Sequence, residues 1–280
     1  MTIRKEIQQI LDKYGDLNLI DMLHAYLAEK NQKEQQKRYE EGRIGKFYPS
    51  SVGQCKRKVV YQMMGYPGKP IPGRNLLVLD NGTYFHERME RYFEEMGLLI
   101  APELKLVNEE LRISGRSDAI IWNFLKGNRQ PPKEDPIITL YRPGKDGGPD
   151  ELVYKGPASD VLIVEFKSIK SRSYHEYLPK TKPKREHEMQ LQLYFYLTGI
   201  REGLVYYENK DTQEHKYYHV TYNQQLVDEI IADIRFILKH VDEGTLPERE
   251  FPPTSFECRY CDYRDICYPV QNTYNLEEMI

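Results

Sequence analysis

The sequence predicts an α/β fold in which helices flank a central mixed sheet. Three patterns indicate it: apolar and polar residues alternate over residues 104–122, residues 161–164 form an unbroken apolar run, and apolar residues recur at helical spacing over residues 226–241. Alternation is typical of a half-buried strand, and a short apolar run of a strand buried on both faces. With 280 residues, the chain can bury one substantial core with appendages.

Residues 1–45 are predicted to form an N-terminal helical arm, followed by one domain over residues 46–280. Ile3, Ile7 and Ile10 define an apolar stripe at helical spacing, and a second amphipathic segment follows. We interpret the arm as a packing element, a dimer contact or a handle for a partner protein. A further helix is expected over residues 82–97.

Residues 104–122 are expected to form a hairpin that turns near Asn108 and leads into a strand closed by Asp118. Residues 127–157 are rich in proline and glycine and contain a strand-like run at 137–141. They are expected to form a protruding loop or hairpin, which either gates the substrate or is a neutral insertion.

The C-terminal half continues the alternation of helices and strands. A helix over residues 185–198 is expected to end at Gly199, and strands are expected at 204–207 and 217–220. The long amphipathic helix over 226–241 follows, ended by Gly244.

Asp118, Glu165 and Lys167 carry the clearest chemical signal. Residues two apart on a strand share a face, so Glu165 and Lys167 point the same way and Phe166 points the other way. Two carboxylates can hold a hard divalent cation, while an ammonium orients water or offsets charge on a phosphate. The pattern predicts a magnesium-dependent phosphodiesterase; the alternative is a set of solvated surface charges.

The sequence around these residues resembles the RecB-like branch of the PD-(D/E)XK nucleases, specifically the members with an iron-sulfur cluster, such as the CRISPR-associated adaptation nucleases. The resemblance covers residues 49–268. The family's Gly-x-x-Asp matches Gly115 to Asp118, and its Glu-x-Lys matches Glu165 to Lys167. It implies a restriction-endonuclease-like core.

The resemblance implies further metal ligands. His86, on the expected helix, would join Asp118, Glu165 and the backbone carbonyl of Phe166 around Mg²⁺ or Mn²⁺. A nitrogen ligand beside two carboxylates shifts the preference from magnesium toward manganese. The alternative for His86 is a hydrogen-bonded residue on the polar face of its helix.

Gln190 and Tyr194 match the family's Gln-x-x-x-Tyr, which implies a catalytic role for both. Gln192 and Tyr196 have the same spacing, but the upstream motifs and His187 sit where the family's pattern expects the first pair. Residues four apart share a helix face, so either pair could reach the metal site together. An amphipathic helix with its glutamines in solvent is the alternative.

The cysteines form a second constellation, made of Cys55, Cys258, Cys261 and Cys267. No signal-peptide pattern is present, which disfavours disulfides. Three clustered thiolates and one remote thiolate suit zinc as well as iron and sulfur. The resemblance implies a structural 4Fe-4S cluster within residues 255–270, with zinc as the alternative occupant.

The net charge of −3 gives no global support for a nucleic-acid partner, but residues 167–185 hold seven basic residues against one acidic residue. Basic side chains can follow a phosphate backbone, and interleaved tyrosines can stack on unpaired bases. A solvated loop broken by prolines is the alternative. The predicted DNA contacts are Lys170, Arg172, Tyr174, Lys180, Lys182, Lys184 and Arg185.

The resemblance implies a metal-dependent DNA exonuclease that acts on single-stranded ends, with 5'-to-3' as the expected polarity, in DNA repair, recombination or CRISPR adaptation. The alternative is a partner-dependent or inactive DNA-binding subunit of a larger nuclease complex. No residue excludes RNA as the substrate. There is no Walker motif, so any unwinding is assigned to a helicase or recombination partner, and no apolar run has membrane-spanning length, so a cytoplasmic, intracellular location is expected.

Overall fold

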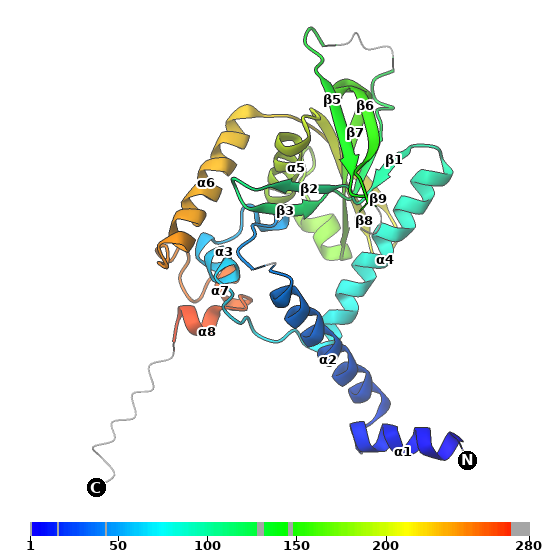
Figure 1. The fold of residues 1–280 in the computed structure, drawn as a ribbon, viewed down its shortest axis with the longest axis vertical. Coiled ribbons are helices and arrows are strands. Elements are labelled where there is room, and N and C mark those ends of the chain that lie inside the picture. Colours follow the sequence, from blue (N-terminus) through cyan, green and yellow to red (C-terminus); the bar gives the residue numbers. More distant parts are fainter. Residues whose placement is uncertain (1, 16, 43, 128–131, 145–147, 270–280) are drawn as a thin grey trace.

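A mixed five-stranded sheet forms the centre of the computed structural model, which describes residues 2–15, 17–42, 44–127, 132–144 and 148–269 (Figure 1). Neighbouring strands are antiparallel except β7 and β8, which are parallel. The α/β class and the mixed sheet are therefore confirmed. In spatial order the strands are β1 Leu99–Pro102, β4 Ala119–Trp122, β7 Val161–Ile169, β8 Glu202–Asn209 and β9 His215–Thr221.

The central strand, β7, is buried on both faces because its first six residues are all buried. Leu162, Val164 and Phe166 pack into a cluster with α4, whereas Val161 and Ile163 pack into a cluster with α5. This division follows from the two-residue repeat of a strand. Glu165 therefore points to the α5 side of the sheet, the side opposite to Phe166.

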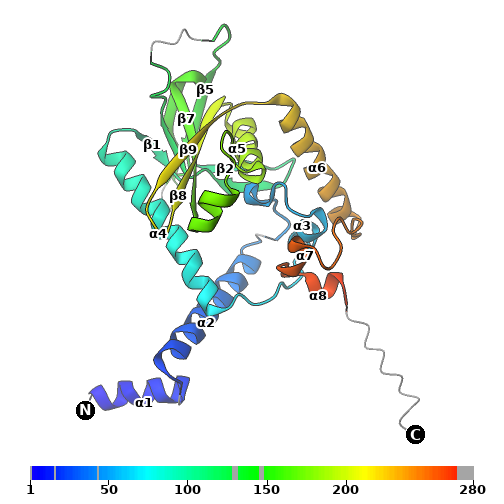
Figure 2. The same ribbon diagram turned by 180° about the vertical axis from the view of Figure 1, so that it is seen from behind.

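Helices cover the sheet in layers, with α4 on one face and α5 on the other (Figures 1 and 2). Behind α5, a second apolar cluster joins it to α3 and α6. Gly199 ends α5 with a φ of 78°, as the sequence predicted. These helices are α3 Lys56–Met63, α4 Gly73–Glu95, α5 Arg185–Thr198 and α6 Gln224–Asp242.

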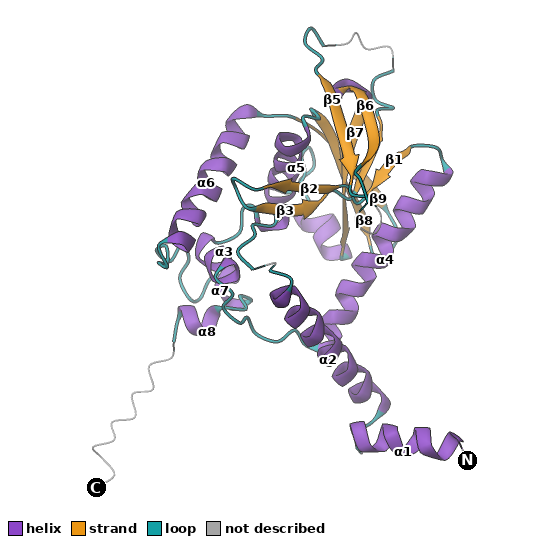
Figure 3. Cartoon of the chain, viewed as in Figure 1, coloured by secondary structure: helices purple, strands orange, loops and turns teal. Residues whose placement is uncertain are grey.

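Two hairpins lie outside the central sheet (Figure 3). β2 Lys105–Asn108 and β3 Ile113–Arg116 form the hairpin predicted near Asn108. β5 Ile137–Arg142 and β6 Glu151–Pro157 form a second hairpin within the predicted 127–157 insertion, of which residues 128–131 and 145–147 lie outside the described part. β1 and β6 are strands that the sequence patterns did not predict.

The N-terminal segment forms two helices, α1 Thr2–Tyr14 and α2 Leu19–Glu40, and α2 lies against α4 (Figure 1). Gly73 of α4 allows the close approach, because a Cβ atom there would lie 2.6 Å from the Cα atom of His24. A helical N-terminal segment is thus present, and the domain boundary near residue 45 stays a prediction.

The C-terminal segment folds back onto α3 through two short helices, α7 Phe256–Arg259 and α8 Arg264–Cys267. Tyr263 stacks on Tyr61 of α3 with ring centroids 5.5 Å apart. The backbone N–H of Lys69 donates to the carbonyl of Asp262 at 3.1 Å. Within the described ranges, no helix has both the length and the apolar character needed to cross a bilayer.

Candidate active site

Asp118 lies in the two-residue link between β3 and β4, and not at the end of a strand as the sequence pattern predicted. Its carboxylate Oδ2 accepts a hydrogen bond from the backbone N–H of Phe166 at 2.7 Å. Ala119 pairs with Val164 in the antiparallel ladder, so Asp118, one residue before Ala119, comes level with Glu165. The local fold therefore places the two carboxylates next to each other.

Gly115, three residues before Asp118, is required because Pro49 packs closely against its backbone. A Cβ atom on Gly115 would lie 2.5 Å from Cδ of Pro49, a distance that real contacts do not reach. Pro49 belongs to the 3₁₀ turn Pro49–Ser51, which packs beside β3. The glycine of the Gly-x-x-Asp pattern thus has a packing reason in this chain.

Glu165 and Lys167 share the α5 face of β7 and are in direct contact. Lys167 Nζ donates to Oε1 of Glu165 in a short hydrogen bond. The other oxygen, Oε2, is buried and has no hydrogen-bond partner among the described residues. A buried carboxylate oxygen without a partner is costly, which marks this atom as a position for a ligand.

His86 approaches the same carboxylates from α4. Its Nδ1 lies 3.4 Å from Oδ1 of Asp118. Its ring also contacts the Phe166 ring edge to face, with centroids 5.7 Å apart. The structure therefore brings His86, Asp118 and the β7 segment 165–167 together from three different elements.

The charges at the site act on one another. Burial and then the adjacent Asp118 carboxylate raise the pKa of Glu165, against the opposing effect of Lys167. Burial lowers the pKa of Lys167, but the charges of Glu165 and Asp118 more than reverse this and raise it. Lys167 therefore stays an ammonium, and Glu165 holds a proton more tightly than an exposed carboxyl does.

His86 responds to the same charges. Burial lowers the pKa of its imidazole, but a hydrogen bond and the negative charge of Asp118 together raise it above the ordinary value. A metal ion at this position would compete with that proton, because a histidine ligand must be neutral. Metal binding and proton release at His86 are therefore coupled.

Gln190 and Tyr194 reach this site, whereas Gln192 does not. Gln190 Oε1 accepts from Lys167 Nζ at 3.3 Å, and Gln190 Nε2 donates to the Tyr194 hydroxyl at 2.9 Å. The Tyr194 hydroxyl donates to the carbonyl of Arg116 at 2.8 Å, two residues before Asp118. Gln192 instead accepts from the backbone N–H of Asn223 and donates to the carbonyl of Thr221.

The side chains at this site fit a divalent cation, although they are not already arranged as a metal-binding site. In the described part of the chain, no group of three or more His, Cys, Asp or Glu side chains is arranged ready to hold a metal ion. The partnerless Glu165 Oε2, the adjacent Asp118 and the nitrogen of His86 supply the oxygen-rich environment that Mg²⁺ and Mn²⁺ prefer. The Phe166 carbonyl as a further ligand stays a prediction.

The four cysteines do not form the predicted cluster site in this structure. Cys55 is the N-cap residue of α3, and all four thiols are half-buried and free. Three thiols are nowhere gathered around one point in the described part of the chain. The fold brings the segments together, but Cys258 Sγ contacts the Phe251 carbonyl, and Cys261 Sγ accepts from the backbone N–H of Tyr263.

The basic segment is partly engaged with the protein itself. Residues 173–177 of this segment form a π-helical turn. Arg172 pairs with Glu176 at 2.9 Å and Arg185 with Glu229 at 3.3 Å, while Tyr174 packs in part against the core. Of the remaining predicted DNA contacts, Lys170, Lys180 and Lys182 are exposed and Lys184 is half-buried.

Tyr207 is a further residue near the site: it is fully buried on β8 beside Lys167 and contacts His187. Glu90, also not predicted, lies one helical turn after His86, and its pKa is raised to about 7 by burial and then by Glu103. The i, i+4 spacing of His86 and Glu90 on one helix was the available signal. No pattern in the sequence pointed to Tyr207.

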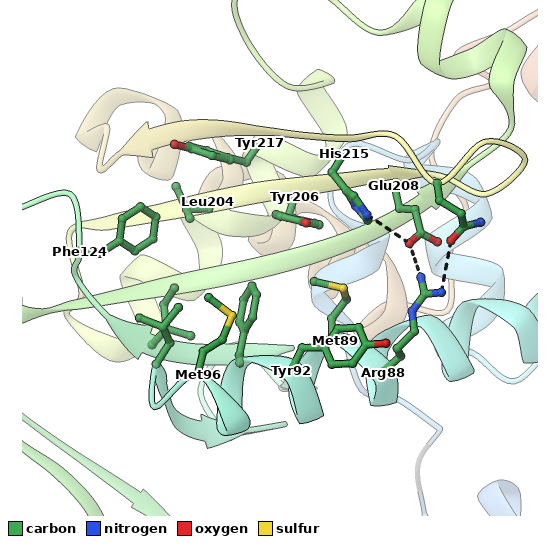
Figure 4. A pocket seen from close by; sticks show the side chains of 14 residues that line it. Arg88, Met89, Tyr92, Met96, Phe124, Leu204, Tyr206, Glu208, His215 and Tyr217 are labelled. Atoms are coloured by element: carbon green, nitrogen blue, oxygen red, sulfur yellow. Dashed lines mark hydrogen bonds and ion pairs between the residues drawn. The ribbon is translucent and has the colours of Figure 1, made fainter.

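A pocket of about 440 Å³ lies on the other face of the sheet, between α4 and strands β8 and β9 (Figure 4). Tyr92, Met96 and Tyr217 are among its apolar walls, and Arg88 contacts the buried Glu208 at one end. None of the predicted catalytic residues lines it. The pocket is therefore separate from the carboxylate site.

Comparison with known proteins gives one match to a protein family and several distant similarities to solved structures. Residues 147–268 match the model of the PD-(D/E)XK nuclease superfamily. No curated protein matches the chain. The crystal structure of SSO0001 is similar at 18% identity and a TM-score of 0.47, over 86% of this chain and 96% of that one.

An alkaline exonuclease (LHK-Exo) from Laribacter hongkongensis is similar at 13% identity and a TM-score of 0.47, over 74% of this chain and 93% of that one. Its complex with dAMP gives 14% identity and a TM-score of 0.41, over 72% and 91%. The family match contains Glu165, Lys167, Gln190 and Tyr194, whose side chains meet beside Asp118. The similarity of this chain to the PD-(D/E)XK nuclease superfamily thus extends over residues 147–268.

Proposed function

We propose that the protein is a divalent-metal-dependent deoxyribonuclease that acts as an exonuclease on single-stranded DNA ends. The observation that carries the proposal is the buried Oε2 of Glu165, without a partner in the described structure, beside Asp118, His86 and Lys167. This arrangement supplies two carboxylates and a nitrogen for a metal ion, and a cation on the other side of Glu165. The family match over residues 147–268 supports the same chemistry.

In the proposed reaction, Asp118, Glu165 and His86 would hold Mg²⁺ or Mn²⁺. The bound ion would polarise the phosphodiester and lower the pKa of a water molecule. Lys167, which stays charged, orients the attacking water and offsets negative charge that develops on the phosphate. Gln190 fixes the Lys167 ammonium, and Tyr194 anchors Gln190 to the backbone just before Asp118.

The resemblance to the RecB-like nucleases implies that the enzyme acts on single-stranded ends in the 5'-to-3' direction, and we include both properties in the proposal. The exposed Lys170, Lys180 and Lys182, between β7 and α5, support a phosphate backbone beside the carboxylates. The pathway we propose is DNA repair, recombination or CRISPR adaptation, with a helicase or recombination protein as partner. The side chains that we propose as catalytic are all present, and Lys167 contacts both Glu165 and Gln190, which favours an active enzyme over a silent binding subunit.

We also propose a structural 4Fe-4S cluster on the four cysteines, with zinc as the alternative. The support is placement: α3, which Cys55 caps, packs against the tail that carries Cys258, Cys261 and Cys267. In the structure the thiols are not gathered, so cluster formation would require the short segments 256–267 to rearrange. Such a cluster would tie the start of the domain to its end and stabilise the fold.

The test is cleavage of end-labelled single- and double-stranded DNA by anaerobically purified protein with manganese, beside a Lys167→Ala variant. Lys155, exposed on β6, gives the matched control Lys155→Ala. We expect metal-dependent products from the wild type and Lys155→Ala, and none from Lys167→Ala. Labels released at the 5' end first would support the proposed polarity.

Absence of cleavage with every divalent metal would contradict the exonuclease proposal. If added partner protein then restored cleavage, the partner-dependent subunit would replace it. Cleavage of RNA and not of DNA would change the substrate class and leave the catalytic residues as assigned.

A further inference from the structure

His187 lies in the first turn of α5, on the helix face that carries Gln190 three residues later. Gln190 contacts Lys167, and Tyr207 on β8 stands directly beside Lys167 in the parallel register of the sheet. The Tyr207 hydroxyl contacts Nδ1 of His187 at 2.6 Å. His187 therefore sits one helical turn from the Gln190–Lys167 contact, above the neighbouring strand.

The hydrogen bonds of Tyr207 fix the protonation of His187. The Tyr207 hydroxyl accepts from the backbone N–H of Lys184 at 3.2 Å. Its single hydrogen then needs an acceptor, because Tyr207 is fully buried, and the acceptor within reach is Nδ1 of His187. A neutral imidazole that accepts at Nδ1 carries its hydrogen on Nε2.

The charges around His187 keep the ring neutral. Burial, followed by the positive charges of Lys167 and Lys184, lowers the pKa of His187 to about 3. A histidine with a lowered pKa stays uncharged at every pH above that value. No hydrogen bond within the described part of the chain uses Nε2 of His187, and the residue is half-buried, not enclosed.

We propose that His187 forms a substrate-binding subsite in which its Nε2–H donates to a non-bridging phosphate oxygen of the nucleic-acid strand, next to the phosphate that is cleaved. The inference rests on the proposed nuclease function and names a contact within it. The exposed Lys182 and the half-buried Lys184 supply positive charge around this subsite. The neutral Nε2–H donor of His187 would orient the phosphate oxygen, whereas the lysines would attract the phosphate by their charge.

The two kinds of contact differ in their dependence on salt. A lysine that neutralises a phosphate releases counterions, so its loss lowers the slope of log Kd against log salt by about 0.7 for single strands. A neutral imidazole releases none. Loss of the His187 donor should therefore weaken binding at every salt concentration and leave the slope unchanged.

The experiment is fluorescence anisotropy of a labelled single-stranded deoxythymidine oligonucleotide with the full chain in EDTA, over a series of NaCl concentrations. We expect His187→Leu to bind about tenfold more weakly, as for the loss of a hydrogen bond to a charged group, with the wild-type slope. His187→Gln, which keeps an N–H donor near the position of Nε2, should recover most of the affinity. Lys182→Ala is the matched comparison and should lower the slope.

Wild-type affinity in His187→Leu would overturn the subsite and leave the nuclease proposal standing. A lowered salt slope in His187→Leu would show a charged histidine, which also contradicts the inference. A wild type that neither binds nor cleaves DNA would remove both proposals. If His187→Leu fails to fold by circular dichroism, ¹⁵N NMR of labelled histidine decides instead: His187 protonated on Nδ1 would overturn the assignment, and Nε2–H at neutral pH together with rescue by His187→Gln would support it.

Discussion

Lys167 Nζ binds Oε1 of Glu165, while Oε2 of the same carboxylate is buried with no hydrogen-bond partner among the described residues. One oxygen is thus neutralised by an ammonium, while the charges of Asp118 and His86 act on the same carboxyl group. This division explains how a buried acid can serve two purposes. In the proposed reaction, it would fix the Lys167 ammonium beside the phosphate and leave an oxygen for a metal ion.

Glu165 should make the metal-free protein sensitive to pH. Its pKa is raised above the ordinary 4.5, so the folded chain holds this proton more tightly than the unfolded chain does. The metal-free protein therefore loses stability as the pH rises from about 4.5 through the raised pKa, by up to about 1.4 kcal/mol for each pH unit. Glu165→Gln should remove this loss. Thermal melts in EDTA between pH 4 and 9 would measure it, and parallel curves for both proteins would contradict it.

Manganese should stabilise the wild type and not the ligand variants. A ligand that binds only the folded state adds about 2.7 kcal/mol at one hundred times its Kd. We expect the melting temperature of the wild type to rise with Mn²⁺, and that of Asp118→Asn to stay constant. The effect should weaken as the pH falls, because protons on Glu165 and His86 compete with the metal. The Asp160→Asn variant, remote from these carboxylates, is the control, and equal shifts in all three proteins would show binding elsewhere.

Gln190 and Gln192 should separate activity from stability. Gln190→Ala removes the contact to Lys167, so we expect cleavage to fall by about 10²-fold with a small change in stability. Gln192 is fully buried and satisfies the backbone of Thr221 and Asn223, so Gln192→Ala should cost about 1–3 kcal/mol. Denaturant melts beside single-turnover cleavage would show the contrast. Loss of activity in Gln192→Ala at temperatures where it stays folded would contradict this division.

Cys261→Ser should report on the proposed cluster. If the four thiols bind a 4Fe-4S centre, anaerobically purified wild type is brown and contains iron, and the variant is colourless and less stable. Zinc in place of iron would give a colourless wild type with bound zinc. Full stability and an unchanged iron content in Cys261→Ser would contradict the proposed structural cluster. Wild-type protein that contains neither iron nor zinc would also contradict the cluster, and would agree with the separate thiols in the structure.

The order of elements and the identity of the acidic strand were predictable from the sequence, because side-chain periodicity is local. The apolar run over 161–164 indicated a buried strand, and alternation placed Glu165 and Lys167 on one face, as the structure has them. Gly199 ended its helix at the predicted position. The same local signals misjudged Asp118, which lies in a link, because a polar residue beside a strand does not reveal where the ladder begins.

Only the tertiary structure decided which side chains meet. Gln190 and Gln192 are two residues apart on one helix, and their local patterns are equivalent. The packing of α5 against β7 sends one to Lys167 and the other to the chain at Thr221. Likewise, the tautomer of His187 depends on Tyr207, twenty residues later and on another strand. Contacts of this kind arise when separate elements pack, and the sequence around each residue carries no record of its partner.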